Sequence, residues 1–236
     1  IAALDKMFMC GNYGDPAASK HTLMIYQQFR QLNPDIVLGM NTNGALQNAL
    51  WWNELGRIFN QPKDYVVFSI DGLEDTNAIY RQGVDWHKLM VNVASFVNAG
   101  GSAHWDMLVY QHNEHQVDQC EQLARDMGFR WFRAKVSRRA LTKNLQLPSS
   151  WPTPAASTGS IQCHALKEHS VYIDAQGRIS PCCWLGNRQH DFITDLDTVA
   201  VTWHTDSPHP VCQSTCSQSN NKTSFSAQWQ REVQLC

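Results

Sequence analysis

Five cysteines in the last third of the chain constrain its fold more than any other feature. These residues are Cys163, Cys182, Cys183, Cys212 and Cys216. Thiolates so widely spaced in sequence meet at one point only if the chain folds around a metal ion or a cluster. This part of the chain is therefore predicted to form a small, cysteine-rich metal-binding region.

The eight cysteines of the chain could also pair as disulfides in a secreted protein. Disulfide-rich scaffolds, however, are usually short and poor in alternating helices and strands. This chain has 236 residues, and its apolar periodicity alternates between the two types. We therefore expect reduced thiols and a cytoplasmic location.

The charge balance gives no reason to expect nucleic acid or an anionic membrane as a partner. Lys and Arg total 19 against 21 Asp and Glu, so the chain lacks the basic excess that such partners attract. No apolar run approaches the roughly 18 residues that would cross a bilayer. We expect neither partner.

Residues 1–140 alternate between short apolar runs and stripes of apolar residues with helical spacing. The runs predict five strands, and the stripes between them predict four helices. The predicted strands are Met7–Cys10, Ile36–Met40, Tyr65–Ile70, Ala103–Tyr110 and Trp131–Ala134. The short connections permit right-handed crossovers, which indicates a parallel α/β sheet, either barrel-like or doubly wound.

Polar and glycine-rich segments follow these strands. Parallel folds place their ligands at the carboxyl ends of the strands, so the segments predict a binding site. The candidate residues are Gly11, Gly14, Asp15, Thr42, Asn43, Ser69, Asp71 and Asn113. Each also has a structural interpretation, because glycine permits tight turns and Ser, Thr, Asp and Asn form turns and helix caps.

Arg81 is a further candidate, and the sequence leaves two interpretations of it open. Its guanidinium could pair with a carboxylate of a bound ligand, or it could be a solvated surface group. It follows the third predicted strand within Tyr80-Arg81-Gln82-Gly83.

The character of the chain changes after residue 137. Residues 141–160 are rich in Pro and Ser and are predicted to be a linker. Val171–Asp174 and Arg178–Ser180, separated by a Gln176-Gly177 turn, predict a hairpin that leads to Cys182. Residues 161–217 would form the cysteine-rich domain, and residues 218–236 a C-terminal tail.

Taken in order, these motifs resemble the radical S-adenosylmethionine superfamily with a C-terminal SPASM or twitch-type auxiliary cluster domain. The segment Gly11–Pro16 is similar to the family's Gly-Gly-Glu-Pro turn. Thr42–Gly44 and Ser69–Gly72 resemble the ends of its next two strands, and Tyr80–Gly83 resembles the segment that follows. Cys163, then Gly177 with Cys182, then the pair Cys212 and Cys216 resemble the auxiliary cluster domain. The resemblance covers roughly residues 1–216 and implies a partial (β/α)6 barrel that lacks its first strand.

The sequence departs from the family pattern in two ways. The Cys-x3-Cys-x2-Cys loop that holds the family's first cluster is absent, and only Cys10 lies in the first hundred residues. We expect a truncated start, with that loop upstream, and an inactive fragment in its absence. Asp15 also stands where Glu is usual, with two residues inserted between the glycines, so the charge is kept on a shorter side chain.

The resemblance implies an enzyme whose cofactors are S-adenosylmethionine and [4Fe–4S] clusters. Such enzymes form a 5′-deoxyadenosyl radical that abstracts hydrogen from a substrate, and the protein supplies orientation and exclusion of water. The expected substrate is a peptide or protein, and the expected electron donor a flavodoxin or ferredoxin. No acid or base can be named from the sequence.

The resemblance implies Cys163, Cys182, Cys212 and Cys216 as the four ligands of an auxiliary [4Fe–4S] cluster. Cys183 could replace Cys182, because neighbours in a strand point to opposite faces and only one would reach the cluster. The same four thiolates would also suit structural zinc. The alternative function is therefore a non-catalytic binding module with a degenerate α/β domain and a zinc site.

Overall fold

The structure of the protein is a computed structural model, and it divides into two compact units. The first unit contains Ile1–Thr153 and Trp229–Cys236, and the second contains Pro154–Gln228. The described residues are 1–137, 145–151, 161, 163–186, 210, 212, 216 and 229–236. Predictions that fall on other residues, including most of the linker 141–160 and residues 218–228 of the tail, lie outside the described part.

A six-stranded sheet forms the centre of the first unit. Its strands lie in the order β1-β2-β3-β4-β5-β8. Their bounds are Lys6–Met9, Val37–Thr42, Tyr65–Ser69, Ala103–Val109, Trp131–Val136 and Arg231–Gln234. Neighbouring strands from β1 to β5 are parallel, which confirms the predicted parallel α/β sheet.

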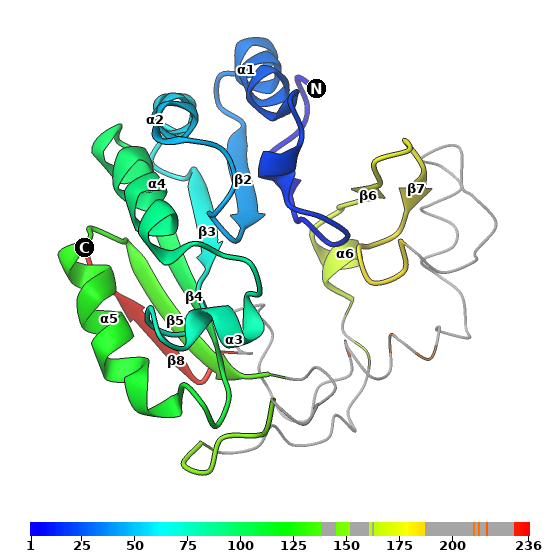
Figure 1. Ribbon diagram of the computed structural model, residues 1–236. Helices are drawn as coiled ribbons and strands as arrows, with labels where there is room; N and C mark the ends of the chain where they lie inside the picture. Colours follow the sequence, from blue (N-terminus) through cyan, green and yellow to red (C-terminus); the bar gives the residue numbers. More distant parts are fainter. Residues whose placement is uncertain are drawn as a thin grey trace. The chain divides into compact units, whose positions relative to one another are not determined.

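The helices of the first unit alternate with the strands. They are α1 (Thr22–Leu32), α2 (Ala49–Ile58), α3 (Asn77–Tyr80), α4 (Trp86–Asn98) and α5 (Val117–Asp126), with the single turns η1 (Pro16–Ala18) and η2 (Glu114–Gln116). The long helices α1, α2, α4 and α5 all lie on one face of the sheet (Figure 1). The short helix α3 was not predicted, because its four residues fall in what the sequence indicates to be a loop.

Local capping sets where the helices begin. Asn48 accepts a hydrogen bond from the Trp51 amide at 3.1 Å, so α2 begins at Ala49. Asp85 caps α4 in the same way, through the Lys88 amide at 2.9 Å. These caps fix the lengths of the connections that carry the candidate site.

The two faces of the sheet differ in composition. In β4 the fully buried residues Ala103, Trp105 and Met107 alternate with the half-buried His104 and Asp106. The buried set packs in the main core under the helices, together with Trp52, Phe68, Phe96 and Phe132. Among the described residues of the first unit, no helix covers the opposite face, which carries His104 and Asp106 (Figure 1).

The strand β8 is the main surprise of the fold. Residues 218–236 were predicted to be a tail, but Arg231–Gln234 pairs antiparallel with β5, placing Phe132 opposite Val233. The strand contains one apolar residue, so periodicity alone gives little sign of it. The end of the chain therefore belongs to the first unit.

The second unit is described in part. It contains the short helix α6 (His164–Lys167) and an antiparallel hairpin of β6 (Tyr172–Ile173) and β7 (Ile179–Ser180). Gly177 lies in the turn with a φ of 78°, which glycine adopts without a steric penalty. The predicted hairpin is confirmed. The bounds of the cysteine-rich domain, residues 161–217, stay a prediction.

Within the described part of the chain, no helix combines the length and apolar character needed to cross a membrane.

Candidate functional site at the carboxyl edge of the sheet

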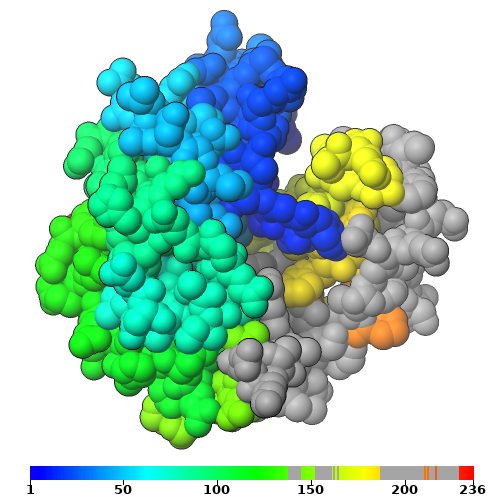
Figure 2. Space-filling view, in the orientation of Figure 1, coloured from blue at the N-terminus to red at the C-terminus, as the bar shows by residue number. Residues whose placement is uncertain are grey.

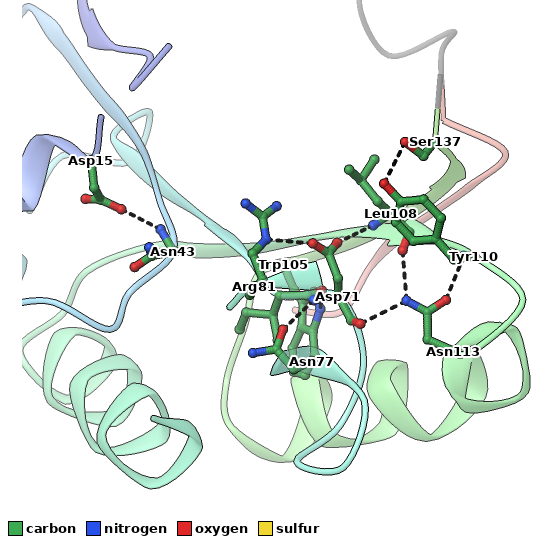
Figure 3. Close-up of polar contacts among 11 residues, drawn as sticks. Asp15, Asn43, Asp71, Asn77, Arg81, Trp105, Leu108, Tyr110, Asn113 and Ser137 are labelled. Carbon is green, nitrogen blue, oxygen red and sulfur yellow. Dashed lines mark hydrogen bonds and ion pairs between the residues drawn. The ribbon is translucent and has the colours of Figure 1, made fainter. Parts of the chain in front are cut away.

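The candidate residues of the first unit lie where the parallel strands end. Because β1 to β4 run in the same direction, the segments after them gather along one edge of the sheet. The turn after β1 is exposed, and the deep-blue part of the chain that contains it lies at the surface in Figure 2. Along this edge the candidates form two hydrogen-bonded groups (Figure 3).

Asp15 joins the ends of the first two strands. Its carboxylate accepts hydrogen bonds from the Thr42 hydroxyl at 2.9 and 3.0 Å and from the Asn43 amide at 2.7 Å. It also accepts from the Ala17 amide at 2.9 Å and so caps η1. These contacts occupy both of its oxygens. Asp15 therefore holds the turn in place, which gives a structural reason for an acidic residue here.

Thr42 and Asn43 are only partly occupied by this group. The Thr42 hydroxyl donates to Asp15 and accepts from the Gly44 amide at 2.9 Å, so its hydrogen and one of its two acceptor directions are used. Asn43 Oδ1 accepts from the Ala45 amide at 3.0 Å. Among the described residues, Asn43 Nδ2 has no hydrogen-bond partner, which leaves it available for a ligand.

Asp71 forms the centre of the second group. Its side chain is completely buried, and its carboxylate accepts from Arg81 Nε and from the Leu108 amide, both at 2.6 Å. Its own amide donates to Asn77 Oδ1 at 2.8 Å. A buried carboxylate requires such compensation, so Asp71 joins the ends of β3 and β4 to the start of α3.

Asn113 completes the second group and is also completely buried. Its Oδ1 accepts from the Tyr110 amide at 2.8 Å, and its Nδ2 donates to the carbonyls of Asp71 at 2.8 Å and Leu108 at 3.0 Å. Both N–H groups of the amide and one of the two acceptor directions of its oxygen are thereby used. Asn113 supports the fold of the edge and leaves no donor for a ligand.

Arg81 and Ser69 keep polar atoms available. Arg81 is held through Nε by Asp71, and its two terminal nitrogens point away from that carboxylate (Figure 3). The Ser69 hydroxyl, half-buried at the end of β3, has no hydrogen-bond partner among the described residues. The sequence left Arg81 open between a carboxylate-binding and a surface residue, and the structure places it at the candidate edge.

The two glycines of the first turn differ in what they permit. Gly11 has a φ of 63°, and a Cβ there would lie 3.0 Å from the Gly14 carbonyl oxygen, so the turn itself requires glycine. A Cβ at Gly14 would meet no atom within 4 Å. The space beside Gly14 is therefore open to a ligand.

The thiols of the second unit influence one another. Burial and the neighbouring thiols of Cys163, Cys182, Cys212 and Cys183 raise the pKa of Cys216 to about 11. Burial also raises the pKa of Cys182, and Cys163 Sγ accepts from the Leu166 amide at 3.5 Å. Burial is the larger cause of the shift at Cys216, and the charges of the other four cysteines singled out by their spacing add to it. The described residues contain no group of three or more His, Cys, Asp or Glu side chains arranged closely enough to hold a metal ion.

Cys120, in the core of the first unit, is a packing residue. Cys120 is completely buried in α5, and burial raises its pKa to about 12. It behaves as a small apolar side chain.

Sequence reasoning did not find the ion pair of Asp106 and Arg133, at 2.7 Å on the face opposite the helices. Burial, only partly offset by Arg133 and Lys135, raises the pKa of Asp106 to about 6. The two residues lie 27 positions apart on different strands. Only the register of β4 against β5 places them side by side, and no local pattern reports that register.

Comparison with known proteins supports the fold. No family model matches the sequence, and no curated protein matches it. Streptococcus suis SuiB has a similar structure, with a TM-score of 0.59 at 12% identity over 85% of this chain and 55% of that chain. SuiB bound to S-adenosylmethionine gives 0.58 at 13% identity, over 85% and 54%. SuiB bound to the precursor peptide SuiA gives 0.58 at 12% identity, over 85% and 54%.

The fold is similar to that of SuiB. At this identity the similarity concerns the fold alone. The chain also spans about half the length of the SuiB chains that it matches.

Proposed function

We propose that the chain is part of a radical S-adenosylmethionine enzyme that modifies a peptide or protein. The observation that carries the proposal is the carboxyl edge of the sheet, where unoccupied polar groups and an open glycine backbone lie beside saturated ones. SuiB, which has a similar fold, binds S-adenosylmethionine and a precursor peptide. The sequence motifs at the same strand ends agree with that cofactor.

The available groups at this edge fit S-adenosylmethionine in chemistry. The Arg81 guanidinium suits the methionyl carboxylate, and the Ser69 hydroxyl and Asn43 Nδ2 suit carboxylate or ribose oxygens. The open backbone at Gly14 admits close approach. When bound and reduced through a cluster, the cofactor supplies a 5′-deoxyadenosyl radical.

The other candidates would act by holding these groups in position. Asp15 and Thr42 fix the backbone that carries Asn43, and Asp71 fixes the orientation of Arg81. Asn113 fixes Asp71 through its carbonyl. A partial (β/α)6 barrel therefore remains the proposed architecture, with direct cofactor contact assigned to Gly14, Asn43, Ser69 and Arg81.

We further propose that Cys163, Cys182, Cys212 and Cys216 hold an auxiliary [4Fe–4S] cluster in a SPASM- or twitch-type domain. The thiolate donor set fits such a group, and the thiols of the other three cysteines act electrostatically on Cys216. The cluster would supply one-electron transfer, with a flavodoxin or ferredoxin as the external donor. The Leu166 amide, which contacts Cys163 Sγ, would stabilise the thiolate.

Metal analysis after anaerobic reconstitution with iron and sulfide tests this assignment. We expect iron and sulfide in equal amounts and a broad visible absorbance. We expect both to be lost in Cys182→Ser and retained in Cys183→Ser, the matched control. Zinc without sulfide would instead support the non-catalytic zinc module, and loss in Cys183→Ser alone would exchange the two ligands.

Calorimetric titration with S-adenosylmethionine tests the cofactor site. We expect saturable binding to the reconstituted chain, weakened in Ser69→Ala. If the chain shows no saturable binding, the proposed function is wrong.

A further inference from the structure

A row of polar residues crosses the sheet on the face opposite the helices. The register places Ser69 beside Asp106, Asp106 beside Arg133, and Arg133 beside Glu232, on β3, β4, β5 and β8. All four belong to the first unit. Such a row is unusual on a mostly buried surface. Side chains there are normally apolar, or have all of their polar atoms hydrogen-bonded.

Asp106 and Arg133 form an ion pair that leaves atoms of both residues without partners. Arg133 Nε donates to Asp106 Oδ1 at 2.7 Å, and the side chains are 19% and 18% exposed. Among the described residues, Asp106 Oδ2 and the two terminal nitrogens of Arg133 have no hydrogen-bond partner. One acceptor and two donors therefore lie next to each other on a mostly buried surface.

The surroundings leave this carboxylate poorly compensated. Burial raises the pKa of Asp106 to about 6, although the cations Arg133 and Lys135 oppose the shift, and the charge of Asp71 adds to it. Glu232 faces Arg133 from β8, which balances the charge of the row. A further hydrogen-bond donor at Oδ2 would stabilise the charged form of Asp106.

Trp229 restricts what can approach Arg133. The Arg133 guanidinium carbon lies 4.8 Å from the centre of the Trp229 ring, and Lys135 Nζ lies 4.3 Å from it. These cation–π contacts hold the guanidinium plane in one orientation. A second cation at Asp106 would be repelled by Arg133 and Lys135, and a second anion by Asp106, which favours a neutral, dipolar ligand.

We propose that Asp106 and Arg133 form a binding site for a primary amide, the side-chain carboxamide of an Asn or Gln in a peptide substrate, with Asp106 Oδ2 accepting one amide N–H and Arg133 donating to the carbonyl oxygen. A primary amide offers one N–H and its carbonyl oxygen on the same edge of a plane, which matches the two adjacent unoccupied groups of the pair. A backbone amide does not match them, because its N–H and carbonyl point in opposite directions. The inference rests on the proposed function only in taking the amide from a peptide substrate.

Carboxyl and guanidinium NMR of the full chain, titrated with acetamide, tests the site without S-adenosylmethionine or a cluster. We expect the Asp106 carboxyl signal and the Arg133 side-chain signals to shift together along one saturating curve. We also expect the pKa of Asp106 to fall from its value of about 6, because the amide N–H favours the carboxylate. Asp118, whose side chain is 87% exposed and paired with Arg231, is the control for non-specific effects.

Two variants complete the test. In Arg133→Lys the guanidinium donors are lost, and we expect the response of Asp106 to weaken several-fold. In Asp106→Ala the response of Arg133 should disappear, and the dispersion of the remaining amide signals reports whether the variant folds. Equal shifts at Asp106 and Asp118, or responses unchanged by Arg133→Lys, would overturn the inference. Binding of S-adenosylmethionine with no amide response would overturn this inference alone, whereas an amide response without cofactor binding would overturn the proposed function alone.

Discussion

Two kinds of polar residue lie along the carboxyl edge of the sheet, and they are used differently. Asp71 and Asn113 are completely buried, and their side-chain oxygens and nitrogens are bonded to the surrounding backbone and to Arg81. Ser69 and the terminal nitrogens of Arg81 have no such partners among the described residues. Both kinds are equally visible in the sequence as polar residues after strands.

The difference teaches that position at a strand end does not by itself identify a ligand-binding residue. Whether the fold already uses the hydrogen-bonding capacity of a side chain separates a supporting residue from an available one. On this criterion Asp15 belongs with the supporting residues. The comparison can be tested by substitutions that affect stability in one group and cofactor affinity in the other.

The largest effect is expected for Asp71→Ala. The substitution leaves Arg81 without its buried partner and the Leu108 amide without its acceptor. Breaking a buried ion pair on one side typically costs about 3–5 kcal/mol, and we expect a loss of this size in the free energy of unfolding, measured by urea denaturation. A stable variant that has lost only cofactor binding would place Asp71 among the ligand-binding residues instead.

Asn113→Ala should have the next largest effect on stability. It removes three hydrogen bonds that join Tyr110, Asp71 and Leu108. At about 1 kcal/mol each, we expect the free energy of unfolding to fall by about 3 kcal/mol. At a temperature where the variant is folded, calorimetry should show an S-adenosylmethionine affinity within about twofold of wild type, because Asn113 makes no proposed contact with the cofactor. A tenfold change in affinity would correspond to about 1.4 kcal/mol of binding free energy. A tenfold loss in the folded variant would contradict a purely supporting role.

Asp106 provides a third case, a buried carboxylate with only one partner. Its folded pKa of about 6 lies above the ordinary value of 3.8, so the unfolded chain ionises first as the pH rises from about 4 to 6. The free energy of unfolding should therefore fall across this window, by about 2–3 kcal/mol at 1.36 kcal/mol per pKa unit. The variant Asp106→Asn should lack this pH dependence.

The difference between wild type and Asp106→Asn isolates this effect from His104. Burial lowers the pKa of His104 to about 3, so His104 contributes stability above pH 6.5 that is lost as the pH falls. This slope is opposite to that of Asp106, and the two overlap. A difference between the two proteins that stays constant from pH 4 to pH 7 would show that Asp106 is not destabilised by burial.

The smallest effect on stability is expected for Ser69→Ala. The hydroxyl has no partner among the described residues, so the free energy of unfolding should change by no more than about 0.5 kcal/mol. The affinity for S-adenosylmethionine should nonetheless fall by about tenfold, as expected for one hydrogen bond to a charged ligand group. Thr42→Val, which removes a hydroxyl already bonded to Asp15, is the matched comparison. It should lower the free energy of unfolding and leave the affinity for S-adenosylmethionine nearly unchanged.

Much of the fold followed from local pattern. Apolar runs and glycine turns predicted the five parallel strands to within two residues at each end, and the Gly177 turn predicted the hairpin. The strand β8 was missed because Arg231–Gln234 contains a single apolar residue and pairs with a strand almost a hundred positions earlier. Pairing at that distance depends on tertiary contacts that leave no local signal.

The sequence predicted where the candidate site lies but not which of its polar groups are already hydrogen-bonded within the fold. Parallel strands bring their carboxyl ends together, so Asp15, Ser69 and Asp71 could be placed at one edge from the sequence. The hydrogen bond between Asp71 and the Leu108 amide spans 37 positions, and the pairing of Asp106 with Arg133 depends on strand register. The sequence therefore indicated which residues meet but not which of them remain available.

Calorimetric titration of the full, anaerobically reconstituted chain with S-adenosylmethionine tests the central claim most directly. We predict saturable heat that corresponds to one cofactor bound at the carboxyl edge. We predict weaker binding in Arg81→Gln, which lacks the guanidinium. An absence of saturable heat from a folded chain, or binding of equal strength in Arg81→Gln, would contradict it.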